Sequence, residues 1–212
     1  MSWKLSCPVL RGAWLSNGSC LPDSDPKVVE AELLSGSLFC PFCNGVLRPW
    51  GHARSRTIRM CNGTKTLCPR RSRCSNCFKT SVLLPCYLLV RRVDEAALIG
   101  SALVQKARGL GHRKIALDIS RPETTVRGWI RRFRENSEIL LEHFTNWALA
   151  LNVTLSEITP VGSLFADAIS AIGIAVRSLS IRFGPSPKWS QMSLMCGGRL
   201  LSNTNSPFPA PS

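Results

Sequence analysis

Two Cys-x-x-Cys pairs constrain the fold of this chain more than any other feature. Cys40 and Cys43 form the first pair, Cys74 and Cys77 form the second, and thirty residues separate the pairs. A turn of this length directs two sulfurs at one point, and Zn²⁺ prefers four such ligands in a tetrahedron. The spacing therefore predicts one structural zinc ion, held by these four cysteines in a small β-rich zinc ribbon over residues 37–93.

Other uses of the ten cysteines stay open at this point. Cys61 and Cys68 lie between the pairs and could replace a ligand, and a pair could instead be redox-active or a set of free thiols. The remaining cysteines have no metal-like spacing, and His52 is expected to be a surface histidine. No secretory signal is apparent at the N-terminus, so we expect metal ligands rather than disulfides.

The charge of the chain is concentrated in its middle. Lys and Arg total 27 against 13 Asp and Glu, which gives a formal net charge of +14. From Cys40 to Val93 there are 11 basic residues and no acidic ones, and from Arg108 to Arg134 there are 8 basic residues against 2 acidic ones. This excess predicts a polyanionic partner, nucleic acid or an anionic membrane surface, with a solvated basic surface as the alternative. No apolar run is long enough to span a membrane, so no membrane partner is expected.

Hydrophobic periodicity divides the rest of the chain. We predict an N-terminal arm over residues 1–36 with a short helix from Lys27 to Leu34, on which Val28 and Ala31 share a face with Leu34. A helix-turn-helix domain is predicted over residues 94–144, a C-terminal helical extension over 145–184 and a disordered tail over 185–212. The expected fold class is mainly α with a small β zinc ribbon, in which the ribbon precedes a homeodomain-like helical domain.

The helix-turn-helix prediction depends on two short helices joined by a turn at residues 120–122. Ser120 and Glu123 have the spacing of a capping box at the start of the second helix. The second helix has an apolar stripe on one face and a polar, basic face opposite, which is what a reader of the major groove needs. Gly128 on this helix could allow close approach to DNA or tight helix packing. The alternative is a plain helical hairpin with a solvated basic face.

Candidate DNA contacts follow from this assignment. On the second helix and its turn we expect base contacts from Arg121, Thr124, Thr125, Arg127 and Arg131. In the ribbon we expect arginine side chains to bind DNA phosphates. The first candidates are Arg71 and Arg73, which lie just before the second Cys-x-x-Cys pair. The other candidates are Arg54, Arg56, Arg59 and Arg70.

The order of these motifs resembles an uncharacterised bacterial family of zinc-ribbon and helix-turn-helix proteins. The residues that carry the likeness are the two Cys-x-x-Cys pairs, His112 to Ala116, and Thr125 to Phe133. The same order is similar to the N-terminal DNA-binding region of insertion-sequence transposases that begin with a zinc ribbon. The resemblance spans roughly residues 29–144 and implies recognition of DNA ends. Ser120 stands where many helix-turn-helix motifs have glycine.

A catalytic transposase is not expected. Such enzymes cut DNA with a carboxylate triad that binds two metal ions, and after Thr145 the chain offers only Glu157 and Asp167 as acids. We therefore expect a sequence-specific binder of double-stranded DNA, a transcriptional regulator or a transposon-derived accessory protein, located in the cytoplasm with the nucleoid. The alternatives are an RNA-binding or ribosome-associated ribbon protein, and a protein-interaction module with residues 137–183 as its docking or dimer surface. The C-terminal helices are also where a homodimer of this protein could form.

Overall fold

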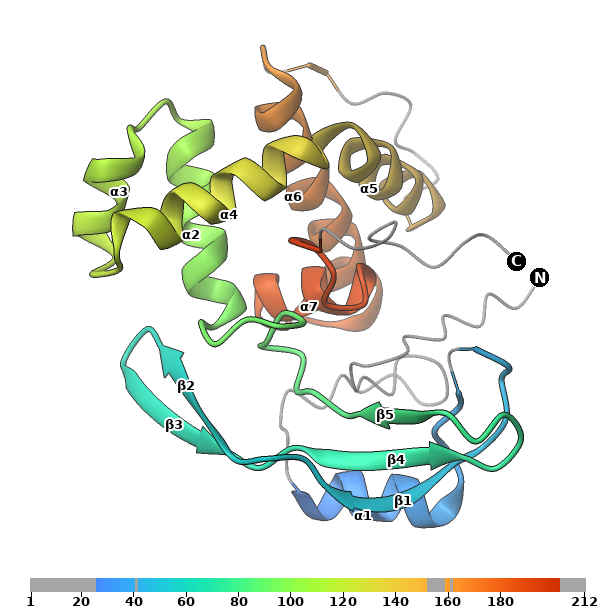
Figure 1. The fold of residues 1–212 in the computed structure, drawn as a ribbon. Helices are drawn as coiled ribbons and strands as arrows, with labels where there is room; N and C mark the ends of the chain where they lie inside the picture. The colour runs from blue at the N-terminus through green and yellow to red at the C-terminus, as the bar shows by residue number, and fades with distance from the viewer. Residues whose placement is uncertain (1–25, 41, 152–158, 161, 203–212) are drawn as a thin grey trace.

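A small antiparallel sheet and a group of helices make up the part of the chain that the computed structural model describes, residues 26–40, 42–151, 159–160 and 162–202 (Figure 1). This confirms the prediction of a mainly helical chain with a small β region. The sheet region contains one helix and all the strands, α1 (Pro26–Ser35), β1 (Leu47–His52), β2 (Arg56–Met60), β3 (Gly63–Leu67), β4 (Arg70–Cys74) and β5 (Thr80–Val82). The helical region contains α2 (Ala96–Ala107), α3 (His112–Asp118), α4 (Glu123–Glu135), α5 (Ser137–Leu151), α6 (Leu164–Phe183) and α7 (Lys188–Met195).

The three-stranded sheet has the order β1-β4-β5, and all its pairs are antiparallel. Leu47 lies opposite Cys74, so the start of β1 is next to the end of β4, where the second cysteine pair begins. Leu47, Cys74 and Leu83 are buried on one face and pack with Cys40 in a small apolar core. The strand pairing thus brings the two cysteine pairs to the same end of the sheet.

Helix α1 covers this apolar core with a face that differs from the predicted one. Val29 and Leu33 are buried against the sheet, whereas Leu34 is 64% exposed. The predicted face of Val28, Ala31 and Leu34 is therefore wrong. Apolar residues occur on both sides of this short helix, so only the packing against the sheet selects the buried stripe.

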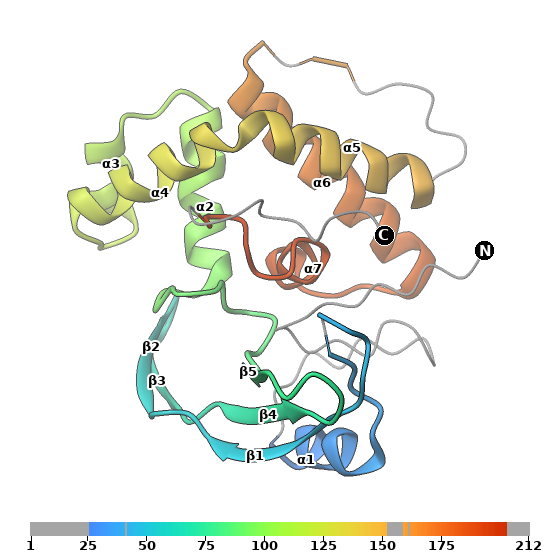
Figure 2. The ribbon, with the colours of Figure 1, turned by 45° about the vertical axis from the view of Figure 1, so that its right-hand side comes forward.

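Strands β2 and β3 form a separate hairpin that leaves the sheet and reaches the start of α2 (Figure 2). The Arg59 N–H donates to the Val93 carbonyl at 2.8 Å, and the Glu95 N–H donates to the Arg59 carbonyl at 3.0 Å. Ile58 is fully buried on this hairpin. Main-chain hydrogen bonds therefore join the sheet region to the helical region.

The helical region encloses one large apolar core to which α2 to α7 all contribute. Helix α5 runs from Ser137 to Leu151, across the predicted boundary between residues 144 and 145, and α6 begins at Leu164. Helix α6 is long and apolar enough to cross a membrane, which corrects the expectation that no run reaches this length, and it is the one such helix in the described part of the chain. Its buried residues, among them Ala168 and Ile172, pack in this core as in the central helix of a globular domain, whereas Leu164 at its start is 47% exposed. The homodimer itself stays a prediction.

Helix α7 contradicts the prediction of a disordered tail over residues 185–212. It lies on the side of the helical region that faces the sheet (Figure 2), and Met192 and Cys196 are fully buried. The Ser193 hydroxyl donates to the Leu88 carbonyl at 3.1 Å. Two of the polar residues of this helix form tertiary hydrogen bonds, Ser193 with Leu88 and Gln191 with Ser180, which the composition does not reveal. Residues 203–212 of the predicted tail, and residues 1–25 of the predicted arm, lie outside the described residues.

The contact between α7 and α2 makes a strong prediction for Gly100. A Cβ atom at this buried glycine would lie 2.0 Å from the Cε2 atom of Trp189. Gly100→Ala is therefore expected to lower the free energy of unfolding by about 1–3 kcal/mol in urea denaturation, because the ring must shift. Gly173→Ala is the control, since Gly173 also lies inside a helix and a Cβ there would meet only the Lys188 Nζ atom, at 3.7 Å. Unchanged stability of Gly100→Ala would refute the docking of α7 on α2.

Candidate metal centre and nucleic-acid interface

The four predicted metal ligands come together at one end of the sheet. The Sγ atoms of Cys40, Cys43, Cys74 and Cys77 all lie within 4.8 Å of one another. The Sγ atoms of Cys40 and Cys77 are 3.6 Å apart, and those of Cys43 and Cys74 are 3.4 Å apart. A tetrahedral ion with bonds of about 2.3 Å to sulfur separates its ligands by about 3.8 Å. The four thiols are free of disulfides and could hold a metal ion in this arrangement.

The two knuckles share their local construction. In each, the residue directly after the second cysteine has a left-handed backbone, with φ of 56° at Asn44 and 58° at Phe78. Gly45 completes the first knuckle, because a Cβ there would lie 2.7 Å from the Asn76 Cβ and 3.0 Å from the Cys74 Sγ. Glycine at this position is therefore required by the close approach of the two knuckles.

Main-chain N–H groups surround the sulfur atoms. The N–H groups of Asn76 and Cys77 donate to the Cys74 Sγ at 3.3 and 3.4 Å. Burial of Cys74 opposes its ionisation, but these two donors, together with the Cys43 and Cys77 thiols, outweigh burial and lower the pKa of Cys74 to about 6. The Lys79 N–H lowers the pKa of Cys77, yet burial and the neighbouring sulfurs dominate and raise it to about 12. One thiolate thus forms readily, and further thiolates in this cluster require a cation.

The cysteines between the pairs lie elsewhere. Among the described residues the metal-competent group contains neither Cys61 nor Cys68. Burial and the nearby Glu95 carboxylate raise the pKa of Cys61. The Cys68 thiol contacts the Ala53 carbonyl at 3.5 Å. His52 is exposed at the end of β1, as expected.

A Schellman motif ends α3 and makes the turn to α4. The Arg121 N–H donates to the Ala116 carbonyl at 3.0 Å, and the Ser120 N–H donates to the Leu117 carbonyl at 3.2 Å. Ser120 has a φ of 51°, the left-handed conformation that glycine usually supplies in this motif. The turn therefore forms with Ser120 at the position where many helix-turn-helix motifs have glycine.

The predicted capping box is wrong. Pro122 is the residue before α4, and no side chain caps the helix there. Glu123 instead bonds across the turn to α3, at 2.9 Å from the His112 Nε2 and 3.4 Å from the Arg113 Nε. Burial raises the pKa of Glu123, but hydrogen bonds from His112 and Arg113 outweigh it and lower the pKa. The acid thus neutralises basic residues of α3, because the left-handed Ser120 turns the chain back over that helix.

Helix α4 has a buried face and an exposed face, as the periodicity predicts. Its apolar stripe of Val126, Trp129, Ile130 and Phe133 is buried in the large core. The opposite face carries candidates for base contact, of which Thr124, Arg127 and Arg131 are exposed and Thr125 is half-buried.

Gly128 lies among these exposed residues. A Cβ at Gly128 would meet only the Arg132 guanidinium, at 3.1 Å, and that group is the end of a flexible side chain. Tight helix packing therefore does not require this glycine.

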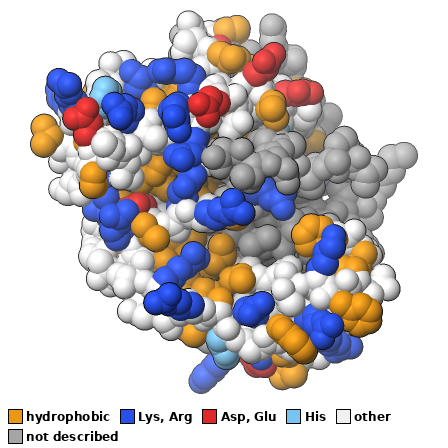
Figure 3. All heavy atoms as spheres, viewed as in Figure 1, with side chains coloured by type: hydrophobic (Ala, Val, Ile, Leu, Met, Phe, Trp, Pro, Cys, Tyr) orange, Lys and Arg blue, Asp and Glu red, His pale blue; other side chains and the backbone are white. Residues whose placement is uncertain are grey.

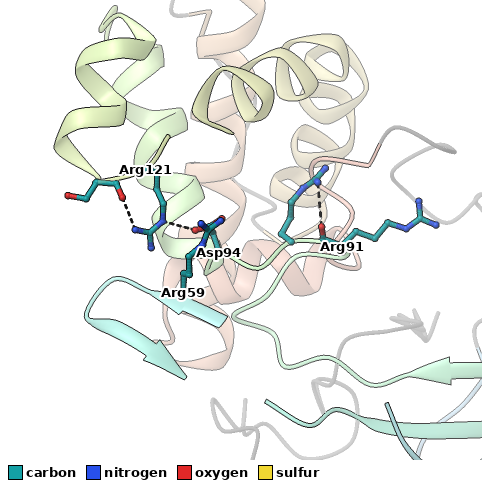
Figure 4. Close-up of polar contacts among 6 residues, drawn as sticks. Arg59, Arg91, Asp94 and Arg121 are labelled. Atoms are coloured by element: carbon teal, nitrogen blue, oxygen red, sulfur yellow. Dashed lines mark hydrogen bonds and ion pairs between the residues drawn. The ribbon is translucent and has the colours of Figure 1, made fainter. Parts of the chain in front are cut away.

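Arg121 does not lie with the other candidates, which corrects its predicted role in base contact. Its Nε atom donates to Asp94 Oδ1 at 2.7 Å, and its side chain is only 15% exposed (Figure 4). Arg59 of β2 donates to the other oxygen of Asp94, also at 2.7 Å. Asp94 is 2% exposed, so one buried carboxylate joins the hairpin to the α3–α4 turn.

The sequence reasoning missed Asp94 as a contact between the two regions. Asp94 lies two residues before the start of α2, and its carboxylate oxygens accept from Arg59 and Arg121. One pattern could have found it, because Asp94 is the first acid after the acid-free stretch from Cys40 to Val93. A buried acid in so basic a chain is expected to pair with arginine.

The other ribbon arginines fall into two groups. Arg70 is occupied by Glu30 of α1, with 2.7 Å between its Nε and Oε2, and burial lowers the pKa of Arg56. These two, like Arg59, are poorly placed for the predicted phosphate contacts. Arg54 is exposed, and Arg71 and Arg73 are half-exposed on β4.

Basic side chains are numerous on the face of the molecule drawn in Figure 3. Figure 3 shows Lys and Arg over α3 and α4 at upper left and continuing down to the sheet region, with few acidic side chains between them. Comparison of the chain with protein-family models, with curated proteins and with solved structures gave no match. The site must therefore be interpreted from its own geometry.

Proposed function

We propose that this protein binds double-stranded DNA in a sequence-specific manner, with α3 and α4 acting as a helix-turn-helix and the cysteine cluster holding one structural zinc ion. The observation that carries the proposal is the exposed face of α4, where Thr124, Arg127 and Arg131 stand clear of the core. A helix held by one apolar stripe and free on its basic face can enter a major groove.

Zinc fits the donor set better than other metals. Four cysteine sulfurs favour a soft or borderline ion in tetrahedral coordination, and they leave no position for a reactive water molecule. The small apolar core beneath the cluster supplies little folding energy by itself. The role of the metal is therefore structural, and the convergence of all four sulfurs argues against a redox role for one pair.

The assignment of roles on α4 follows its geometry. Arg127 and Arg131 are four residues apart, so both can point into one groove and hydrogen-bond guanine in bidentate fashion. Gly128 between them has no packing role and allows the helix backbone to approach DNA. Arg71 lies on β4, where a phosphate contact is the simpler interpretation.

The proposal is tested by selection of bound sequences from a random duplex library, followed by binding to single-base variants of the selected site. Arg127→Ala or Arg131→Ala should relax the preference at one or two positions, a loss of about 1–3 kcal/mol of discrimination. Arg71→Ala is the matched control and should weaken all sequences equally and reduce the slope of affinity against salt by about one phosphate. Wild-type base preferences in both α4 variants would exclude this helix as the reader.

Such a protein would act as a transcriptional regulator or as a transposon-derived accessory protein in the cytoplasm, associated with the nucleoid. No enzymatic role is proposed. Equal competition by structured RNA and duplex DNA for the protein would favour the RNA-binding alternative instead.

A further inference from the structure

Exposed aromatic rings surround the metal cluster. Phe42, Trp50 and Phe78 are 58%, 49% and 62% exposed. Together with Arg73 and Lys79 they form what we call the aromatic patch. Figure 3 shows hydrophobic and basic side chains interleaved over the end of the sheet where the cysteines lie, at lower right. Phe42 and Phe78 are each adjacent in the sequence to a cysteine of the cluster, and the fold brings Trp50 of β1 to Arg73, the residue before Cys74.

The rings are held by cations. The Arg73 guanidinium lies 4.6 Å from the centroid of Trp50 and 5.2 Å from that of Phe78. Its Nε atom also donates to the Phe78 carbonyl at 3.3 Å. The Lys79 Nζ lies 4.3 Å from the centroid of Phe42. Each ring therefore has a positively charged neighbour over part of its surface, and about half or more of each aromatic residue still remains exposed to solvent.

Phe78 adds a second indication that this surface has a use. It has a left-handed backbone, which is uncommon for a bulky residue, and its ring is the most exposed of the three. Residues in such conformations gather at ligand sites. The knuckle would form as well with glycine or asparagine, so its own folding does not explain a phenylalanine here.

The charge around the rings favours a polyanion over an apolar protein surface. No acidic residue occurs from Cys40 to Val93, and Glu30 of α1 is occupied by Arg70. Bases stack on aromatic rings with little sequence preference, and adjacent cations hold the phosphates. In a duplex the base faces are covered by their neighbours, so only unpaired nucleotides can use the rings in this way.

We propose that the aromatic patch binds unpaired nucleotides of single-stranded DNA, with bases stacked on Trp50, Phe78 and Phe42 and phosphates near Arg73 and Lys79. This site is separate from the exposed face of α4. The choice of DNA over RNA rests on the proposed function. The stacking of bases on the aromatic patch rests only on the exposed rings and the cations beside them.

The test compares a labelled oligothymidylate with an abasic oligomer of the same length, which keeps every phosphate and removes every base. In fluorescence anisotropy the wild-type protein should bind the oligothymidylate at least about tenfold more tightly than the abasic oligomer. Trp50→Ala and Phe78→Ala should each lower the affinity for oligothymidylate by about tenfold and leave the abasic affinity unchanged. Trp50→Phe should retain most of the affinity, because it keeps a flat ring.

Leu117→Ala is the matched control, since Leu117 is 82% exposed on α3 and its truncation should change neither affinity. Unchanged metal content shows that each variant is folded. Equal wild-type affinity for the two oligomers would overturn the proposal, because phosphates alone would then explain binding. Tighter binding of oligouridylate than of oligothymidylate would overturn the choice of DNA.

A self-association that Trp50→Ala abolishes, with unchanged oligothymidylate affinity, would identify the patch as a protein interface and overturn the proposal. The duplex function is tested separately. Arg127→Ala should alter duplex recognition and leave the affinity for oligothymidylate unchanged. The two experiments therefore distinguish failure of the duplex-binding proposal from failure of the aromatic-patch proposal.

Discussion

Replacing Cys40 and Cys43 together by serine is expected to abolish metal binding and unfold the sheet region. The wild-type chain should bind close to one equivalent of zinc in elemental analysis, and the double variant should bind none. Structural zinc sites in small domains supply about 10–16 kcal/mol of apparent binding free energy, which is also folding free energy. The small core of α1 and the three-stranded sheet cannot replace a contribution of this size.

The helical region should survive this change. Its large core shares no residue with the core beneath the cysteines, so circular dichroism should retain most of its helical signal while the amides of β1 and β4 lose protection from exchange. Cys61→Ser with Cys68→Ser is the control, and it should leave the metal content at one equivalent. Full metal in the Cys40→Ser, Cys43→Ser variant would refute the site.

Asp94→Ala is expected to lower the free energy of unfolding by about 2–4 kcal/mol, because it leaves two arginines without their common carboxylate. The side chain of Arg121 is 15% exposed and that of Arg59 is 37% exposed, so only Arg59 can recover much hydration. Urea denaturation measures the loss. Hydrogen exchange should show that the hairpin of β2 and β3 opens more often, since its side-chain link to the turn before α4 is gone.

A surface ion pair provides the control for this experiment. Glu135 lies 3.7 Å from Arg131 on α4, and both side chains are mostly exposed. Glu135→Ala should therefore change stability by about 0.5 kcal/mol or less. If Asp94→Ala costs no more than Glu135→Ala, the buried carboxylate does not hold the hairpin on the helical region.

Sequence patterns predicted correctly those features that depend only on residues close together in the chain. The ligand set Cys40, Cys43, Cys74 and Cys77 followed from spacing alone, and it converges in the structure. The apolar stripe of α4 also followed from periodicity, since a helix of this length has one face to bury. The prediction of α7 failed because its polar side chains form tertiary bonds that composition does not reveal.

The sequence by itself determined which residues could bind a metal and which side of α4 faces the core, because both depend on short-range spacing. Only the tertiary structure decided the partners of residues far apart along the chain. It placed Arg121 on Asp94 rather than on the exposed face of α4, and it gathered Trp50 and Phe78 around Arg73. Ion pairs and ring contacts of this kind depend on distances in space. Turns and strand register determine those distances, and neither produces a periodic pattern in the sequence from which the contacts could be predicted.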